Sequence, residues 1–216
     1  MSPAVIAETQ DQRTDDWRLA RAGRITASRF ADAIDLNKKT GKPSAARTKY
    51  QMELVAEILS GQPRHEISAQ AMAWGRDVET YAREAFEIET GLVVHETGFI
   101  THPDYPFIGC SPDGLVGELD GFESKCPFNE AVHIQTIIEG MPAGHREQVQ
   151  GCMLVTGRKR WHFVSYDPRQ AEPYRLHHEV VERDDAYIND ILLPGLLDFW
   201  ADVQGTVKAV RTAKGE

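Results

Sequence analysis

The sequence predicts an α/β fold in which a central mixed β-sheet is flanked by helices. Helical periodicity dominates both ends of the chain, and short β-type runs separated by Pro, Gly and Asp follow Gly91. Helices, strands, helices and strands in that order are typical of helices that cover a sheet. With 216 residues, 41% of them hydrophobic, we expect a single domain over residues 1–216, with a helical part at 1–64 and a core with a C-terminal helix at 65–216.

Capping signals predict two short helices near the N-terminus. Thr14 is a suitable N-cap for a helix that contains Trp17, and Thr26 or Ser28 for the helix that follows. Such caps would bring Arg21 and Ser28 close to helix N-terminal amides.

The rest of the chain divides at glycines, prolines and changes of hydrophobic period. In order we expect an exposed basic loop at 37–43, helices at 44–60 and 68–91, strands at 92–95, 107–110, 115–116 and 122–126, helices at 129–139 and 143–156, strands at 161–166 and 174–181, and a helix from Asp184 to about Val210.

The charge of the chain is unevenly distributed. The net charge is -9, yet residues 21–64 carry nine Lys or Arg against four Asp or Glu. A basic region on an acidic protein suits a polyanionic partner such as nucleic acid, because Lys and Arg neutralise phosphates. A solvated loop around 38–49 explains the same charges, so both interpretations stay open.

Several classes of protein are disfavoured by what the sequence lacks. It has no run of 18 apolar residues and no signal-like N-terminus, so we expect neither a membrane span nor secretion. Its three cysteines form no CxxC pair, which argues against a disulfide framework, a zinc finger or an iron–sulfur cluster. We expect Cys110, Cys126 and Cys152 to be reduced and partly buried.

The strongest chemical pattern combines a Pro-Asp-Gly turn with Glu-x-Lys ten residues later. Glu123 and Lys125 are two apart on a predicted strand and so face the same side. If the strand after Asp113 pairs with theirs, two carboxylates and an ammonium converge. Hard oxygen ligands of this kind suit Mg²⁺, with the backbone carbonyl of Ser124 as an extra ligand. Lys125 would then activate water for attack on a phosphodiester. A structural ion pair is the alternative.

At these positions the sequence resembles the phage-type alkaline exonucleases typified by bacteriophage lambda exonuclease, also called the YqaJ viral recombinase family. Seven blocks in the same order carry the resemblance: Arg21-Ala-Gly-Arg-Ile-Thr-Ala-Ser28, Ala71-Met-Ala-Trp-Gly-Arg-Asp-Val-Glu79, Cys110-Ser-Pro-Asp-Gly114, Glu123-Ser-Lys-Cys-Pro-Phe128, Gln148-Val-Gln150, Tyr166-Asp-Pro-Arg169 and Val181-Glu-Arg-Asp184. The resemblance implies a restriction-endonuclease-like core, of the PD-(D/E)xK nuclease type, and 5′-to-3′ digestion of linear duplex DNA with one or two Mg²⁺ ions, which Mn²⁺ can replace.

The resemblance also implies roles for individual residues. Asp113 and Glu123 match the metal-binding carboxylates, and Lys125 the lysine that activates water. Gln148 matches a supporting glutamine and Glu79 a helical acid at the edge of the site. The pocket for the 5′-phosphate of the DNA end is matched by three further residues, Arg21, Ser28 and Ser111. A guanidinium is a bidentate phosphate ligand, and hydroxyls near helix amides add donors. Trp17 and Met72 match apolar groups that separate the terminal base pairs.

The expected partners follow from the same resemblance. They are double-stranded DNA ends, a single-strand annealing protein and two further copies of the chain in a homotrimeric ring, without a membrane. The resemblance implies a cytoplasmic protein of a bacterial host or prophage.

Structural roles remain alternatives for most of these residues. Glu79 lies three and four residues from Arg76 and Arg83 and can pair with them on a helix. Gln148 and Arg21 can be ordinary surface residues, Ser28 a helix cap and Ser111 a turn serine, while Trp17 and Met72 suit a core. The adjacent His177 and His178 alternate faces on a strand and cannot bind one metal together.

We therefore expect a Mg²⁺-dependent 5′-to-3′ exonuclease that releases mononucleotides and leaves 3′ single strands for recombination. One alternative is a structure-selective or restriction-type endonuclease on the same core. The other is a non-catalytic DNA-end-binding recombination protein in which Asp113, Glu123 and Lys125 form only an ion-pair cluster.

Overall fold

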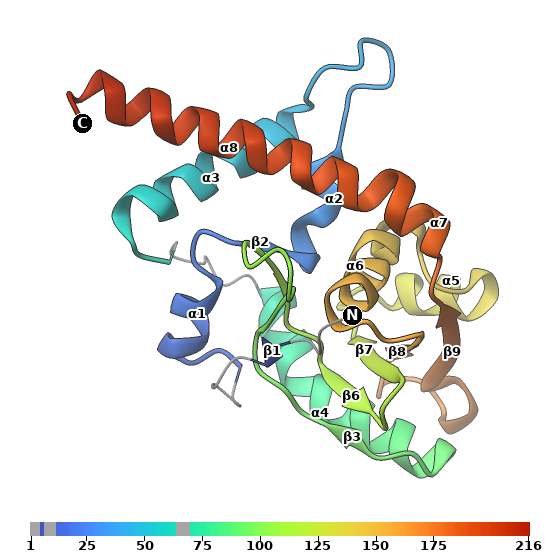
Figure 1. Cartoon of the computed structure of the whole chain (residues 1–216). Coiled ribbons are helices and arrows are strands. Elements are labelled where there is room, and N and C mark those ends of the chain that lie inside the picture. The colour runs from blue at the N-terminus through green and yellow to red at the C-terminus, as the bar shows by residue number, and fades with distance from the viewer. Residues whose placement is uncertain (1–4, 7–11, 64–69) are drawn as a thin grey trace.

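The computed structural model describes residues 5–6, 12–63 and 70–216 (Figure 1). Its helices are α1 (Asp15–Arg21), α2 (Phe30–Ile34), α3 (Ala45–Ser60), α4 (Gln70–Thr90), α5 (Glu130–Glu139), α6 (Arg146–Thr156), α7 (Asp185–Tyr187) and α8 (Leu193–Ala213). Its strands are β1 (Val5–Ile6), β2 (Ile25–Thr26), β3 (Val94–His95), β4 (Ile100–Thr101), β5 (Ile108–Cys110), β6 (Gly114–Val116), β7 (Asp120–Lys125), β8 (Arg160–Tyr166) and β9 (Leu176–Glu182). The predicted α/β class is confirmed.

A five-stranded mixed sheet forms the centre of the fold, in the order β3-β6-β7-β8-β9. β6 and β7 form an antiparallel hairpin, whereas β7 and β8 run parallel and are joined through α5 and α6. A parallel pair needs such a crossover because its connection must return to the starting edge. The sheet therefore places the end of β7 beside α6.

A second, four-stranded sheet has the order β1-β4-β5-β2 and was not predicted as a separate sheet. Three of its strands, β1, β2 and β4, have only two residues each. Strands this short show no alternation in the sequence, so hydrophobic period cannot reveal them. The run at 107–110 belongs to this sheet and not to the central one, which is a correction of the expected single sheet.

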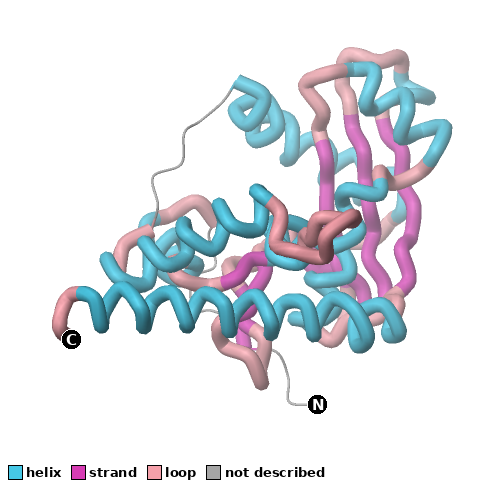
Figure 2. Tube along the Cα trace, turned by 90° about the horizontal axis from the view of Figure 1, so that it is seen from above, coloured by secondary structure: helices cyan, strands magenta, loops and turns pink. Residues whose placement is uncertain are grey.

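Two hydrophobic clusters lie on opposite faces of the central sheet. Trp161 and Phe163 of β8 contribute to a large cluster with α2, α3, α6 and α8. Phe122 and Val164 face the other way, onto a smaller cluster with α4. Figure 1 shows α8 across α3 and α2 on one side of the molecule and α4 on the other. Figure 2 shows the central strands side by side at one end and the C-terminal end of α8 at the other.

Helix ends agree well with the predicted signals, with one exception. The Thr14 hydroxyl accepts a hydrogen bond from the Trp17 amide, and α3 ends at Gly61 with φ 65°. Left-handed backbone of this kind favours glycine. Neither Thr26 nor Ser28 caps α2, because a 3₁₀ turn at Ala27–Arg29 precedes it and Thr26 makes no side-chain cap. That capping prediction was wrong.

The C-terminal helix is attached to the N-terminal part by a buried arginine. Arg47 of α3 is 2% exposed and donates to the Ala33 carbonyl at 2.6 Å. Its other terminal nitrogen lies 2.9 Å from Asp198 and 2.8 Å from Asp202 on α8. The same guanidinium lies over the Phe199 ring. Arg47 therefore joins α2, α3 and α8.

No helix within residues 12–63 and 70–216 is long and apolar enough to cross a membrane.

Candidate active site

Asp113 is held against β7 by the β6–β7 hairpin. Gly114 pairs with Phe122, as the predicted hairpin requires, and a Cβ at Gly114 would lie 2.2 Å from Val94. Asp113 Oδ2 accepts hydrogen bonds from the backbone amide of Ser124 at 2.8 Å and from its hydroxyl at 3.1 Å. These bonds fix the Asp113 carboxylate beside the neighbouring strand.

Glu123, Lys125 and Gln148 form one hydrogen-bonded group. Lys125 Nζ lies 2.5 Å from Glu123 Oε1, so the two side chains share one face of β7 as predicted. Gln148, on α6, donates from Nε2 to the same carboxylate oxygen at 2.6 Å, and its Oε1 lies 3.4 Å from Lys125 Nζ. The parallel crossover between β7 and β8 thus brings the glutamine to the Glu-x-Lys pair. The alternative of Gln148 as an ordinary surface residue is wrong.

The electrostatics of the group reflect burial and mutual repulsion. Glu123 is 2% exposed, and its burial together with the charge of Asp113 raises the pKa of its carboxyl to about 7. Burial alone would lower the pKa of Lys125, but the charges of Glu123 and Asp113 outweigh it and raise the pKa to about 12. Burial, and then Asp113, also raise the pKa of Glu79. The site therefore holds negative charge that one ammonium does not fully compensate.

The donor set fits a hard divalent cation. Glu123 Oε2 is buried and has no hydrogen-bond partner among the described residues, whereas Oε1 receives both Lys125 and Gln148. A buried polar oxygen without a partner is costly unless a ligand satisfies it. In the described part of the chain no three His, Cys, Asp or Glu side chains group closely enough to hold a metal by themselves. Mg²⁺ usually takes only one or two carboxylates and keeps several waters, so Asp113 and Glu123 suffice.

A second group of polar side chains surrounds Ser111, two residues before Asp113. The Ser111 hydroxyl oxygen lies 2.9 Å from Arg21 Nη1 and 2.9 Å from Trp17 Nε1. The Arg21 guanidinium also stacks 4.2 Å from the centre of the Trp17 ring. This stacking fixes the orientation of a planar guanidinium, a group that suits a phosphate. Arg21 is the last residue of α1 and so lies away from that helix's N-terminal amides, contrary to the expectation.

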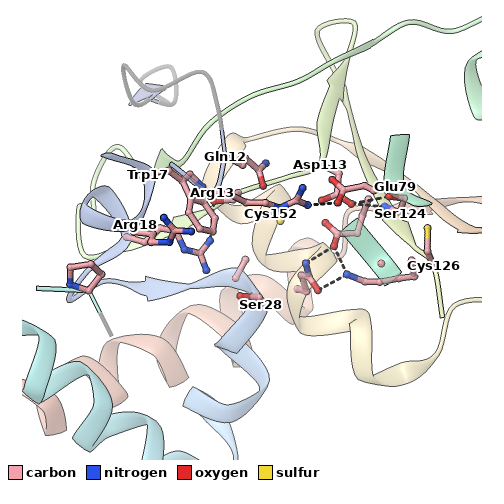
Figure 3. Close-up of a pocket in the computed structure, with 18 of the residues that line it drawn as sticks. Gln12, Arg13, Trp17, Arg18, Ser28, Glu79, Asp113, Ser124, Cys126 and Cys152 are labelled. Carbon is pink, nitrogen blue, oxygen red and sulfur yellow. Dashed lines mark hydrogen bonds and ion pairs between the residues drawn. The ribbon is translucent and has the colours of Figure 1, made fainter. Parts of the chain in front are cut away.

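Both groups line one cavity of about 1130 Å³ (Figure 3). The predicted residues that it brings together are Arg21, Ser28, Glu79, Ser111, Asp113, Glu123, Ser124, Lys125 and Gln148. Ser28 is exposed at its wall, and its hydroxyl lies 3.5 Å from that of Thr26. The direction of the Ser124 carbonyl, and the role of every residue in this set, stay predictions.

The sequence did not identify several residues of the cavity. Gln12, Arg13 and Arg18 line it together with Cys152. Arg13 forms an ion pair with Glu79, whereas Arg83 pairs with Glu96, so the alternative pairing of Glu79 with Arg83 is wrong. The side chain of Arg76, the other partner considered, lies outside the described part. Arg13 and Glu79 are 66 residues apart, and no local pattern could have connected them.

Other predicted features lie elsewhere. The lysines at 38, 39, 42 and 49 are exposed and do not line the cavity, and Figure 1 shows the loop before α3 projecting from the body beyond α8. Trp17 is 8% exposed and lines the cavity. The side chain of Met72 lies outside the described part. His178 contacts His162 at 2.9 Å, while His177 faces Glu179. All three cysteines are free, as predicted.

Comparison with known proteins identifies the family. Residues 16–159, more than half of the chain, match the YqaJ-like viral recombinase domain. The chain is 38% identical to an alkaline exonuclease (LHK-Exo) from Laribacter hongkongensis, with a TM-score of 0.84, over 94% of this chain and 98% of that one. A structure of LHK-Exo in complex with dAMP matches with a TM-score of 0.85 over the same shares and at the same identity.

Two weaker similarities accompany these. A phage related exonuclease from Haemophilus somnus 129PT has a TM-score of 0.65 at 14% identity, over 88% of this chain and 96% of that one, which supports the fold alone. The uncharacterized protein ExoD of Escherichia coli (strain K12) is 38% identical over 50 residues, which are 23% of this chain and 56% of that protein. The extent of the domain match and the 38% identity to LHK-Exo over almost its entire length establish that the chain belongs to the YqaJ-like viral recombinase family, and its fold is that of the alkaline exonucleases.

Proposed function

We propose that this chain is a Mg²⁺-dependent 5′-to-3′ exonuclease that acts on linear double-stranded DNA, releases mononucleotides and leaves 3′ single strands for recombination. The observation that carries the proposal is the shared cavity. The Glu123–Lys125–Gln148 group and the Arg21–Ser111 pair line the same hollow, and Asp113 follows Ser111 by two residues. Residues suited to cleavage and residues suited to binding a terminal phosphate thus lie in one cavity, which suits removal of one nucleotide at a time.

The proposed chemistry is hydrolysis of a phosphodiester by an in-line water. Asp113 and Glu123 would hold one or two Mg²⁺ ions, which Mn²⁺ could replace, with the Ser124 carbonyl as a further ligand. The bound ions would supply stabilisation of negative charge on the attacking and leaving oxygens. Glu123 Oε2, buried and without a partner among the described residues, is the oxygen suited to that contact.

Lys125 would orient the attacking water and take its proton, and Gln148 would support both side chains. Removal of that proton requires a neutral lysine, whereas the charges of Glu123 and Asp113 raise the pKa of Lys125. Neutralisation of those carboxylates by bound cations would lower the pKa of Lys125 again. Glu79 would act at the edge of the site, where it neighbours Asp113.

Recognition of the end would come from Arg21, Ser28 and Ser111, which would hold the 5′-phosphate. The guanidinium can form two parallel hydrogen bonds to a phosphate, and hydroxyls add single ones. Each cut would create a new 5′-phosphate that enters the same pocket, so the chain would digest from 5′ to 3′. The dAMP bound to LHK-Exo supports a nucleoside monophosphate as the product.

The wider context is also part of the proposal. One nuclease domain would extend over 1–216, three copies would form a ring around the DNA, and a single-strand annealing protein would take the 3′ strand. The protein would act in the cytoplasm of a bacterial host or prophage-carrying cell.

Digestion of linear and closed circular duplex DNA, with Mg²⁺ or EDTA, tests the proposal. Loss of the linear substrate alone, only with Mg²⁺, and faster with 5′-phosphate than with 5′-hydroxyl ends, is the expected result. Cutting of the circle would move the chain to the endonucleases. Salt-dependent binding without any product would leave a DNA-end-binding protein.

A further inference from the structure

The backbone of Arg13 is held in an unfavourable conformation. Its φ is 71°, and it is the one non-glycine residue with a positive φ in residues 12–63 and 70–216. Left-handed backbone is unfavourable for a residue with a Cβ, because the Cβ comes too close to the following carbonyl oxygen. The Arg13 side chain is 45% exposed, so burial does not offset this cost. Something other than packing therefore accounts for the direction of this side chain.

The preceding residue anchors this segment to the chain between Ser111 and Asp113. Gln12 Nε2 donates to the Pro112 carbonyl at 2.7 Å and to the Thr97 carbonyl at 3.1 Å. Pro112 lies between Ser111, which would bind the 5′-phosphate, and Asp113, which would bind the metal. Gln12, which precedes α1, is thus fixed to the backbone between Ser111 and Asp113, and Arg13 is the next residue.

The Arg13 side chain extends across the cavity from that anchor. Figure 3 shows it running from the side of Trp17 toward Asp113 and Glu79, with a dashed line to Glu79. A smaller cavity of about 70 Å³ shares Arg13, Glu79 and Asp113 with the main one. The ion pair between Arg13 and Glu79 therefore lines both cavities and is not part of a packed core.

We infer that Arg13 is a further DNA-binding residue, whose guanidinium exchanges Glu79 for a phosphate of the strand entering the cavity. This rests on the proposed function. A strand with its end at Arg21 and Ser111 and its next phosphate at Asp113 and Glu123 passes the position of Arg13. The exchange is feasible because the Arg13 side chain is 45% exposed and an ion pair open to water contributes little stability, so a phosphate can compete with Glu79 for the guanidinium.

Equilibrium binding of a short 5′-phosphorylated duplex in EDTA, over a range of salt concentrations, tests the inference without cleavage. Arg13→Ala is expected to weaken binding roughly tenfold and to reduce the slope of log K against log salt by about 0.9, the value of one phosphate contact. Arg13→Lys should keep the slope, because it keeps the charge. Arg160→Ala is the matched control: Arg160 is 47% exposed, pairs with Asp120 and does not line the cavity.

Glu79→Gln separates this role from a purely structural one. If Arg13 binds a phosphate, the Arg13→Ala/Glu79→Gln double variant should show a smaller salt dependence of DNA binding than Glu79→Gln alone. An unchanged slope in Arg13→Ala, or no further loss in the double variant, would overturn the inference. Failure of the wild-type chain to bind duplex DNA would overturn the proposed function together with the inference. Normal binding by the wild type with no effect of Arg13→Ala would overturn the inference alone.

Discussion

Lys125 Nζ lies 2.5 Å from Glu123 Oε1, and the other oxygen of that buried carboxylate has no hydrogen-bond partner among the described residues. One carboxylate thus has a satisfied oxygen that positions the lysine and an unsatisfied oxygen suited to a cation. Gln148 donates to the satisfied oxygen as well, which prevents the carboxylate from turning freely. In the proposed mechanism one oxygen of Glu123 would bind the metal, and the other would hold the lysine that orients the water.

Lys125→Ala should abolish cleavage and leave DNA binding within about twofold, because in the proposed mechanism this lysine orients and deprotonates water and makes no contact with the DNA end. Single-turnover digestion of linear duplex and binding in EDTA measure the two effects separately. Lys159→Ala is the control, since Lys159 is exposed and outside the cavity. Near-normal turnover by Lys125→Ala would contradict the assigned role.

Arg21→Ala should reduce the preference for 5′-phosphorylated over 5′-hydroxyl ends. The variant loses the guanidinium that is fixed by Ser111 and stacked on Trp17. Arg21→Lys keeps the charge without the planar fork and should retain part of the preference. The ratio of digestion rates on the two substrates is the measurement, and a ratio equal to that of the wild type in Arg21→Ala would exclude the pocket.

Stability without metal should depend on pH through Glu123. Burial and Asp113 raise the pKa of this carboxyl to about 7 from 4.5. Between these values the folded protein binds more protons than the unfolded chain, so the free energy of unfolding falls as pH rises from 4.5 to 7. Thermal unfolding in EDTA should show this fall, and Glu123→Gln should reduce it.

Mg²⁺ should oppose that loss, because it binds the ionised carboxylate. The increase in Tm on adding Mg²⁺ should be larger above pH 7 than below it, and cleavage should decline below about pH 7. An equal increase in Tm for the wild type and Glu123→Gln would show that Glu123 does not bind the metal.

Arg47→Ala should destabilise the fold by about 2 kcal/mol, because the Ala33 carbonyl and the contact to α8 both lose their partner. The loss stays moderate since Asp198 and Asp202 are exposed enough to be solvated. Urea unfolding measures it. Arg47→Met keeps an apolar side chain of similar length at this buried position and should lose less stability than Arg47→Ala. Equal losses would assign the whole effect to the missing hydrogen bonds and ion pairs of the guanidinium.

The hairpin of the site was predictable because its signals are local. Gly114, directly after Asp113, opens strand β6 and not the expected turn, while the spacing of Glu123 and Lys125 fixes their shared face as predicted. The contacts of Arg13 and Gln12 were not predictable, because their partners lie 66 to 100 residues away. The pairing of Ser111 with Trp17 and Arg21 likewise depends on the small sheet, in which β2 runs parallel to β5 directly before Ser111. Two-residue strands such as β2 carry no period from which this could be derived.

The most direct test of the central claim uses a linear duplex labelled at the 5′-phosphate of one strand or at the 3′ end of the same strand. With excess enzyme and Mg²⁺, the 5′ label should be released first, as a mononucleotide, and the 3′ label only after the strand has been digested. Release of the 5′ label within a longer oligonucleotide, or of the 3′ label first, would contradict cleavage one nucleotide from a 5′-phosphate held by Arg21 and Ser111.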